Sequence, residues 1–254
     1  MTKSINKKHL RLKKSVKQFL FIFFLLMCVF SVYIAIYHLK KDSRKAYITK
    51  DIITNIQTEN VDNVLTEVKK LYEENNDLIG YLIIPGTIIN YPVMYTGDDY
   101  YLRRSFNGEY LADGTLYIDK YNSLSPRDTN LIIYGHNMNN NGHMFNDLEK
   151  YMDESFYKEH KTFTYYTLEE KETYEIVAVF LSQVYKVSDN VFKYYKFYNA
   201  LGEEDMQEYY NNIKKLSLYD TGVTLHYGDK LLTLSTCEYS KENGRLAVVA
   251  RKVS

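Results

Sequence analysis

Cysteine is scarce in this chain: only two of its 254 residues are cysteine. One of them, Cys28, lies inside an uncharged apolar run, so Cys237 has no intramolecular disulfide partner and is expected to be either a buried thiol or a reactive one. The chain also lacks internal repeats, low-complexity tracts, a glycine-rich phosphate loop and any cysteine or histidine pair at a recognised metal-ligand spacing. We therefore expect no cofactor and no metal, and Cys237 is the one thiol outside the apolar run that could react.

The chain has no excess charge of either sign, because 32 Lys and Arg balance 32 Asp and Glu. Positive charge is instead concentrated in residues 1–17, which contain lysine and arginine but no acid. A basic segment can bind nucleic acid, but this one adjoins an uncharged run at 18–39 that is rich in Phe, Leu, Ile and Val. Nucleic acid is therefore not an expected partner.

The run at 18–39 has the length of a membrane span. At about 1.5 Å per residue, such a helix crosses the roughly 30 Å hydrocarbon core of a bilayer. The apolar part of a cleavable signal usually has about 7–15 residues, and no small-x-small cleavage site follows this run. A buried core helix would carry polar residues along one face, which this segment does not. We therefore expect an uncleaved signal anchor that contacts membrane lipid.

Basic residues lie on both sides of the run but are more numerous before it. This difference favours an N-terminus in the cytoplasm and a domain outside the cell membrane. The expected organisation is a cytoplasmic basic segment at 1–17, a single-pass transmembrane anchor at 18–39, a stalk and helical region at 40–78, and a globular domain at 79–254.

Hydrophobic periodicity predicts that this domain is mainly β. Apolar residues recur at helical spacing over 52–71, which predicts a stalk helix packed on the domain, and over Glu203–Leu216, a helix inserted before the cysteine strand. Short β-rich runs are predicted at 81–84, 88–94, 115–118, 130–134, 162–167, 174–184, 230–236 and 245–253. Because eight short strands need their edges covered, we expect a closed or nearly closed barrel.

Cys237 ends one predicted strand, and Arg245 begins the next. Strand alternation puts Thr233, Ser235 and Cys237 on one face, and the loop at 238–244 is short enough to make the two strands antiparallel neighbours. An arginine beside the thiol can favour the thiolate and can donate hydrogen bonds to an oxyanion. The pair alone is equally compatible with a buried cysteine beside a surface arginine.

A cysteine nucleophile normally needs a histidine for proton transfer, because a thiol is a weak nucleophile at neutral pH. His136 follows the strand at 130–134 and stands at the mouth of an Asn-rich loop, and His143 at the end of that loop is its main competitor. His160 and His226 are interpreted as surface residues. A metal site formed by His136, His143 and a carboxylate is a further alternative.

At these residues the sequence resembles the class B sortases of Gram-positive bacteria. The resemblance covers roughly 75–253 and includes the insertion that carries the helix Glu203–Leu216. Its motifs are Ile133-Tyr134-Gly135-His136-Asn137-Met138, Met144-Phe145-Asn146-Asp147-Leu148, Thr233-Leu234-Ser235-Thr236-Cys237 and Arg245-Leu246-Ala247-Val248-Val249. Glu238 follows the cysteine where many members have aspartate, a change that keeps the charge.

The resemblance implies an eight-stranded sortase-type barrel at 79–254 and a cysteine transpeptidase. It implies His136, Cys237 and Arg245 as catalytic residues, and Ser235 is taken as a substrate-binding candidate. The implied partners are surface proteins with a C-terminal sorting signal (NPxTN, NPxTG or SPxTG-like) and a peptidoglycan precursor amine. The thiol would attack the threonine carbonyl of the signal, and the amine would then release the thioacyl enzyme.

Two rival functions stay open from the sequence. One is a membrane-tethered cysteine peptidase or peptidoglycan hydrolase, in which water replaces the amine. Papain-like hydrolases place the cysteine before the histidine, whereas here His136 precedes Cys237. The other rival is an inert barrel that binds partners at the cell surface, and such a barrel has no need of Cys, His and Arg at three strand ends.

Overall fold

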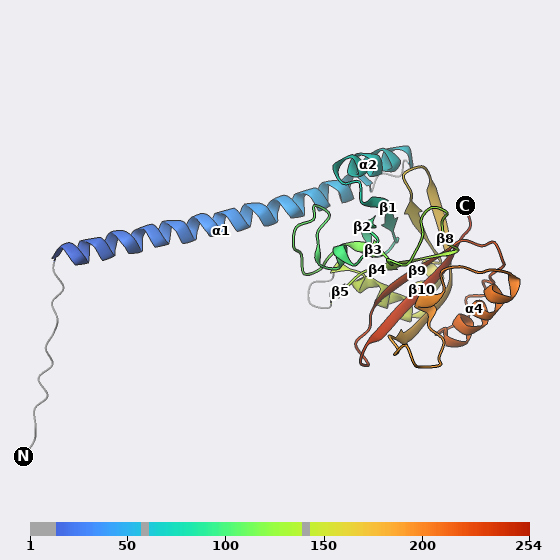
Figure 1. Cartoon of the computed structure of the whole chain (residues 1–254). Coiled ribbons are helices and arrows are strands. Elements are labelled where there is room, and N and C mark those ends of the chain that lie inside the picture. The colour runs from blue at the N-terminus through green and yellow to red at the C-terminus, as the bar shows by residue number, and fades with distance from the viewer. Residues whose placement is uncertain (1–13, 57–60, 139–142) are drawn as a thin grey trace, which may run out of the picture. The chain divides into compact units, whose positions relative to one another are not determined.

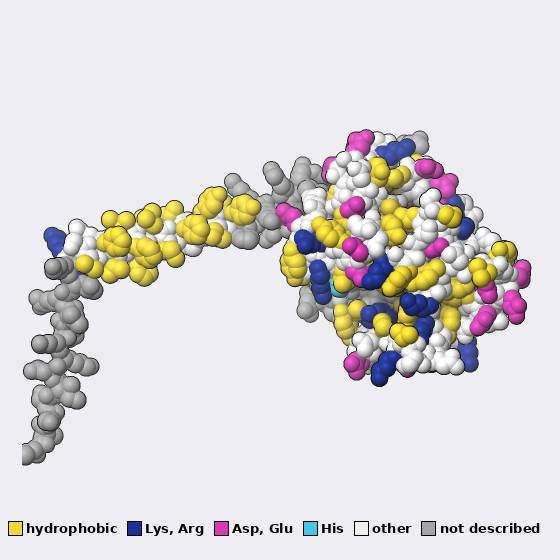
Figure 2. Space-filling model, in the orientation of Figure 1, with side chains coloured by type: hydrophobic (Ala, Val, Ile, Leu, Met, Phe, Trp, Pro, Cys, Tyr) yellow, Lys and Arg dark blue, Asp and Glu magenta, His cyan; other side chains and the backbone are white. Residues whose placement is uncertain are grey.

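A computed structural model describes residues 14–56, 61–138 and 143–254, in two compact units, Met1–Gln57 and Thr58–Ser254. The first unit contains the helix α1, Lys14–Ile56. Its segment Lys14–Tyr37 contains an 18-residue stretch with a mean hydropathy of 2.9 and no buried side chains, and hydrophobic groups cover the face shown in Figure 2. This apolar helix overlaps the predicted span and is a candidate membrane anchor.

The helix predicted over 52–71 is not a single helix. Its first residues, through Ile56, belong to α1, and a second helix, α2, occupies Val61–Glu74. The apolar stripe lapses at 57–60, which lies outside the described residues. Val64, Val68 and Leu71 of α2 are buried, and α2 packs against the first strand of the second unit, as the stripe predicted.

Eight strands form the closed barrel that the sequence predicted (Figure 1). In chain order they are β1 (Leu78–Ile83), β2 (Asn90–Met94), β3 (Leu116–Ile118), β4 (Asn130–Tyr134), β7 (Thr162–Tyr166), β8 (Lys171–Gln183), β9 (Leu231–Cys237) and β10 (Gly244–Lys252). Their order around the barrel is β1-β2-β3-β4-β9-β10-β8-β7, and β7 closes the ring on β1. Closure leaves none of these strands with an unpaired edge.

Two of the pairings in the barrel are parallel. β2 runs parallel to β3, and β4 runs parallel to β9, while the other neighbours are antiparallel. Parallel neighbours cannot be joined by a tight hairpin. The long segment between β4 and β9 therefore first supplies β7 and β8 on the other side of the barrel and then returns through the helix α4 (Glu203–Leu216). This crossover places the strand of Cys237 beside the strand that precedes His136.

Side chains on the two faces of these strands pack into two cores. Leu131, Leu232 and Leu246 point into the barrel and belong to its main core. Ala247 and Val249 point outward and are covered by a second core that includes Met206 and other residues of α4. Within α4, Tyr209, Tyr210 and Ile213 are buried as predicted, but Leu216 is 40% exposed because it lies at the end of the helix.

The short elements between the strands were not predicted. They are the 3-10 helices η1 (Tyr100–Arg103), η2 (Asn146–Met152) and η3 (Tyr194–Lys196), the helix α3 (Glu154–Glu159), and a hairpin of β5 (Asn137–Met138) and β6 (His143–Met144). Each is too short to show a hydrophobic period of its own. Residues 139–142 of the Asn-rich loop lie outside the described residues.

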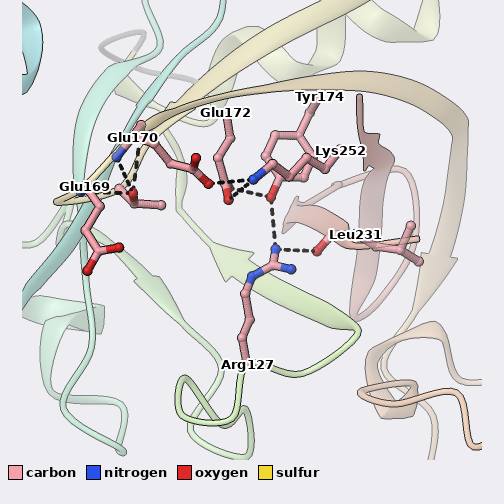
Figure 3. A network of polar contacts seen from close by, with 8 residues as sticks. Arg127, Glu169, Glu170, Glu172, Tyr174, Leu231 and Lys252 are labelled. Carbon is pink, nitrogen blue, oxygen red and sulfur yellow. Dashed lines mark hydrogen bonds and ion pairs between the residues drawn. The ribbon is translucent and has the colours of Figure 1, made fainter. Parts of the chain in front are cut away.

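One end of the barrel is closed by a charged network (Figure 3). Arg127, before β4, donates to the hydroxyl of Tyr174 (2.9 Å) and to the carbonyl of Leu231 (3.4 Å). Glu172, which is 6% exposed, accepts from the Tyr174 hydroxyl (2.7 Å) and pairs with Lys252 (2.9 Å). Cys237 and Arg245 lie at the opposite ends of β9 and β10, about 20 Å away at the usual rise of a strand.

Candidate active site

Cys237 and Arg245 face each other across the ladder of β9 and β10. The two residues are direct register partners, which confirms the predicted antiparallel pairing of their strands. Both are half-buried on the outer face of the barrel. In a pair of this kind the Cβ atoms lie about 5 Å apart, so the thiol lies within the field of the guanidinium.

The tight turn from β9 to β10 determines where Arg245 points. Asn243 adopts a left-handed conformation (φ 55°), and a Cβ at Gly244 would overlap the carbonyl oxygen of Glu238. Arg245 Nη1 donates to the carbonyls of Gly244 (2.8 Å) and Asn243 (3.5 Å). Within the described residues, both hydrogen bonds of this guanidinium use the same terminal nitrogen, which leaves Nη2 and Nε for an incoming oxygen.

His136 lies beside Cys237 because β4 and β9 run in parallel. Tyr134 is the register partner of Ser235, and the two chains stay joined beyond β4. The amide of Gly135 donates to the Ser235 carbonyl (3.3 Å), and Thr236 Oγ1 donates to the Gly135 carbonyl (2.8 Å). A Cβ at Gly135 would collide with Leu116 and Phe145, so only glycine fits here. His136 therefore follows at the level of Cys237.

The imidazole of His136 has a defined tautomer. Its Nε2 lies 2.9 Å from the carbonyl oxygen of Leu102 in η1. A carbonyl can only accept, so Nε2 carries a hydrogen and Nδ1 of the neutral ring is left as a base. Burial lowers the pKa of His136, and Arg103 and Arg245 lower it further, while the Leu102 carbonyl and Asp113 partly oppose this. The ring is therefore held mainly neutral at neutral pH.

The other histidines lie in different environments. His143 is 56% exposed in its side chain and pairs with Asp113 (3.2 Å). His226 is exposed, as expected. The interpretation of His160 as a surface residue was wrong, since its ring stacks on Phe156 (centroids 4.1 Å apart) and lies under Gly86, where a Cβ would meet it.

Ser235 is fully buried below the thiol. Its hydroxyl is hydrogen-bonded to that of Tyr194 (2.7 Å), and Tyr194 is itself 1% exposed. Direct contact of the Ser235 side chain with a substrate would require Tyr194 to move. Burial raises the pKa of Tyr194 to about 12, and both Cys237 and Arg245 are close enough to act on it electrostatically.

Sequence reasoning missed Asn137, which joins the two halves of the site. The side chain is 2% exposed, and its Nδ2 donates to the main-chain carbonyl of Cys237 (3.1 Å). Leu102 and Tyr194 were missed as well. Position next to His136 in the Gly-His-Asn motif is the one signal that could have indicated Asn137. In the part of the chain that the structure describes, no three possible metal ligands cluster.

Comparison with known proteins identifies the family. A model of the sortase domain matches residues 82–253. Sortase B of Listeria monocytogenes is 34% identical over 217 residues, which covers 84% of this chain and 83% of the relative. This chain belongs to the class B sortases. Family membership makes it a cysteine transpeptidase of the sortase type.

Solved sortase B structures share the fold of this sortase. Clostridium perfringens sortase B has 31% identity and a TM-score of 0.66, with 73% of this chain and 99% of that chain covered. A Staphylococcus aureus sortase B-substrate complex has 26% identity and a TM-score of 0.70, with 85% and 97% covered. The match includes the closed barrel that the resemblance implied and the helix before it.

Proposed function

We propose that this sortase cleaves a C-terminal sorting signal after threonine and joins the new carboxyl end to a cell-wall precursor amine through a thioacyl enzyme on Cys237. The observation that carries this proposal is the register of three strands. Cys237 faces Arg245 across one ladder, and His136 follows the parallel strand on the other side. A thiol, a base and a cationic donor are the groups that acyl transfer requires.

In the first acyl transfer, the neutral imidazole of His136 acts as the base. With Nε2–H bound to the Leu102 carbonyl, Nδ1 is left to accept the thiol proton as sulfur attacks the threonine carbonyl. The guanidinium of Arg245 stabilises the resulting oxyanion. The imidazolium then returns the proton to the leaving amine, the peptide bond breaks, and a thioester remains on Cys237.

The second acyl transfer reverses the proton path. The amine of the wall precursor attacks the thioester carbonyl, and His136 Nδ1 takes the proton that this nitrogen loses. The tetrahedral species expels the sulfur of Cys237, which recovers the proton from the imidazolium. One peptide bond has been exchanged for another, and the enzyme returns to its starting state without a cofactor or a metal.

The proposed cargo is a surface protein with an NPxTN, NPxTG or SPxTG-like signal. Ser235 contributes to the substrate side of the site through Tyr194, whose hydroxyl it holds. The candidate anchor in α1 supports a location in the cell membrane. The excess of basic residues before the apolar run favours an N-terminus in the cytoplasm and a barrel outside, where surface proteins and wall precursors meet. Protease added to intact protoplasts should then remove the barrel, and a protected barrel would contradict this orientation.

The activity is tested with a small library of quenched pentapeptides. The full-length protein in detergent micelles is incubated with each peptide, with and without an added amine, and the products are identified by mass. A ligated product in the presence of amine supports transpeptidation. Hydrolysis alone, unaffected by amine, would favour the peptidase alternative, and no turnover together with slow, ordinary alkylation of Cys237 would favour an inert barrel.

A further inference from the structure

The peptide bond that follows Cys237 is held from two sides. On one side, the amide of Glu238 donates to the carbonyl of Gly244 in β10 (3.0 Å). On the other, the carbonyl of Cys237 accepts from Asn137 Nδ2 (3.1 Å), which belongs to β5. A peptide unit has one donor and one acceptor. Because both are engaged by different strands, the plane of this unit is fixed.

The side chain of Asn137 is itself held in one orientation. Its Nδ2 also donates to a carboxylate oxygen of Glu149 in η2 (2.5 Å), and its Oδ1 accepts from Asn146 Nδ2 (2.9 Å). The carboxylate and the Cys237 carbonyl can only accept, so the NH₂ group must face both of them. Both amide hydrogens are used, and a flipped amide would break all three hydrogen bonds.

The main chain of Asn137 completes the link between the two loops. Its carbonyl accepts from the hydroxyl of Tyr239 (2.8 Å), two residues beyond the cysteine. The neighbouring carbonyl of His136 accepts from the amide of Phe145 (2.9 Å). Asn137 is therefore bound covalently to His136 and by hydrogen bonds to Cys237 and to Tyr239.

We propose that Asn137 is a positioning residue that locks the peptide unit after Cys237 and so keeps the thiol directed between His136 and Arg245. The direction of the Cys237 side chain follows from the orientation of its main chain, which the Asn137 amide fixes. A misplacement of about 1 Å can cost roughly 100-fold in rate at a reacting centre. The inference rests on the catalytic roles proposed above and adds a residue that touches neither the substrate nor the reacting atoms.

The chain offers a close match for Asn137 at the other end of the barrel. Asn122 is 3% exposed, and its Nδ2 donates to Asp128 (2.9 Å) and to the carbonyl of Asn130 (2.7 Å). Its Oδ1 accepts from the amide of Ile132 (2.9 Å). Both asparagines thus bridge a carboxylate and a main-chain carbonyl, but only the bridge of Asn137 ends at the nucleophile.

The test compares Asn137→Ala with Asn122→Ala in full-length protein that also carries Cys28→Ser, which leaves Cys237 as the only thiol. For each variant the thermal midpoint and the second-order rate of alkylation by iodoacetamide at pH 7 are measured. Both substitutions should lower the midpoint by comparable amounts. Asn137→Ala alone should slow alkylation, by about fivefold or more, because the freed thiol moves away from His136, the base proposed to take its proton.

Equal alkylation rates in the two variants would make Asn137 a structural residue only, and faster alkylation of Asn137→Ala would mean that it shields the thiol. Alkylation needs no substrate, so its rate can be interpreted even if the protein cleaves no pentapeptide. An intact protein that cleaves none would overturn the proposed function but would not affect this test. Where peptide is cleaved, Asn137→Ala should lower kcat by about 10- to 100-fold with little change in KM.

Tyr239→Phe is a milder variant that tests the same link between the two loops if Asn137→Ala does not fold. Tyr239→Phe removes one hydroxyl from a side chain that is 59% exposed, so it should not affect folding. It releases the carbonyl of Asn137 and should slow alkylation of Cys237 about twofold to threefold. An unchanged rate in this variant would contradict the proposal.

Discussion

The two ends of the barrel use polar groups in opposite ways. At the closed end, the charged groups themselves are hydrogen-bonded (Figure 3). The Glu172 carboxylate accepts from Tyr174 and Lys252. The Arg127 guanidinium donates to Tyr174 and to the carbonyl of Leu231. At the other end, hydrogen bonds hold the main chain around the reactive groups. The peptide unit after Cys237 is hydrogen-bonded at both its carbonyl and its amide, while the contacts of the described residues leave the thiol available to react.

The difference has a physical cause. A buried charge without a partner costs several kcal/mol. Every charged or polar group in a purely structural network must therefore have a hydrogen-bond or ion-pair partner. A catalytic group must remain available to the substrate, and it can be fixed only through atoms that do not react. Substitutions at the closed end should therefore affect stability, and those at the other end should affect turnover.

The largest expected effect comes from Cys237→Ala. This change should abolish both peptide cleavage and the covalent intermediate detected by mass. The free energy of unfolding should fall by only about 1–2 kcal/mol, because one half-buried thiol at a strand end is lost. Cleavage that persists in this variant would rule out Cys237 as the nucleophile. It would also contradict the view that this end of the barrel carries the chemistry.

His136→Ala and Arg245→Ala should each lower turnover by at least about 100-fold, since proton transfer and oxyanion stabilisation both contribute on this scale. His143→Ala is the matched control and should have a much smaller effect, because His143 is exposed and paired with Asp113. An inactive His143→Ala beside an active His136→Ala would reverse the assignment of the base.

Arg245→Lys distinguishes directed hydrogen bonds from charge alone. Lysine keeps the positive charge opposite Cys237 but loses the planar fork of donors. We expect the variant to recover little of the turnover lost in Arg245→Ala when the same pentapeptide is assayed. Near-normal turnover would assign Arg245 a general electrostatic role.

At the closed end, Glu172→Ala should lower the free energy of unfolding by about 2–3 kcal/mol, because Tyr174 and Lys252 lose a buried partner. Turnover per folded molecule should not change. Denaturant unfolding and peptide cleavage measure the two quantities. Glu169→Ala is the control, since this neighbour is exposed and should shift stability by less than about 0.5 kcal/mol. Lost turnover in folded Glu172→Ala would mean that the two ends are coupled.

The smallest effect concerns pH. The folded protein holds the pKa of His136 below the reference value of about 6.5, mainly through burial, so below that pH the unfolded chain binds more protons at this residue. His136 therefore contributes a loss of stability as the pH falls from about 6.5. Unfolding measured between pH 5 and 7.5 should show a shallower loss in His136→Gln, and exposed His226→Gln should leave the slope unchanged.

The sequence predicted the positions of the strands better than it predicted which strands pair with each other. Alternation and turn residues located all eight strands, since they report local burial, and the short loop after Cys237 indicated its pairing with the strand of Arg245. No local pattern could indicate that β4 pairs with β9, because that pairing depends on the whole path between them. The role of Asn137 was hidden for the same reason: its partner, the Cys237 carbonyl, lies 100 positions away.

The parallel pairing of β4 with β9 also sets the order in which the site can appear during synthesis. At roughly 5–20 residues per second, the segment with Asn137 is made on the order of 5–20 s before Cys237, which follows it by 100 positions. In that interval β4 lacks its neighbour β9, and Cys237, the proposed nucleophile, has not yet been added to the chain. Cys237 comes to lie beside His136 only when β9 pairs with β4. The candidate site is therefore complete only when the last two strands of the barrel are in place, β9 with Cys237 and β10 with Arg245.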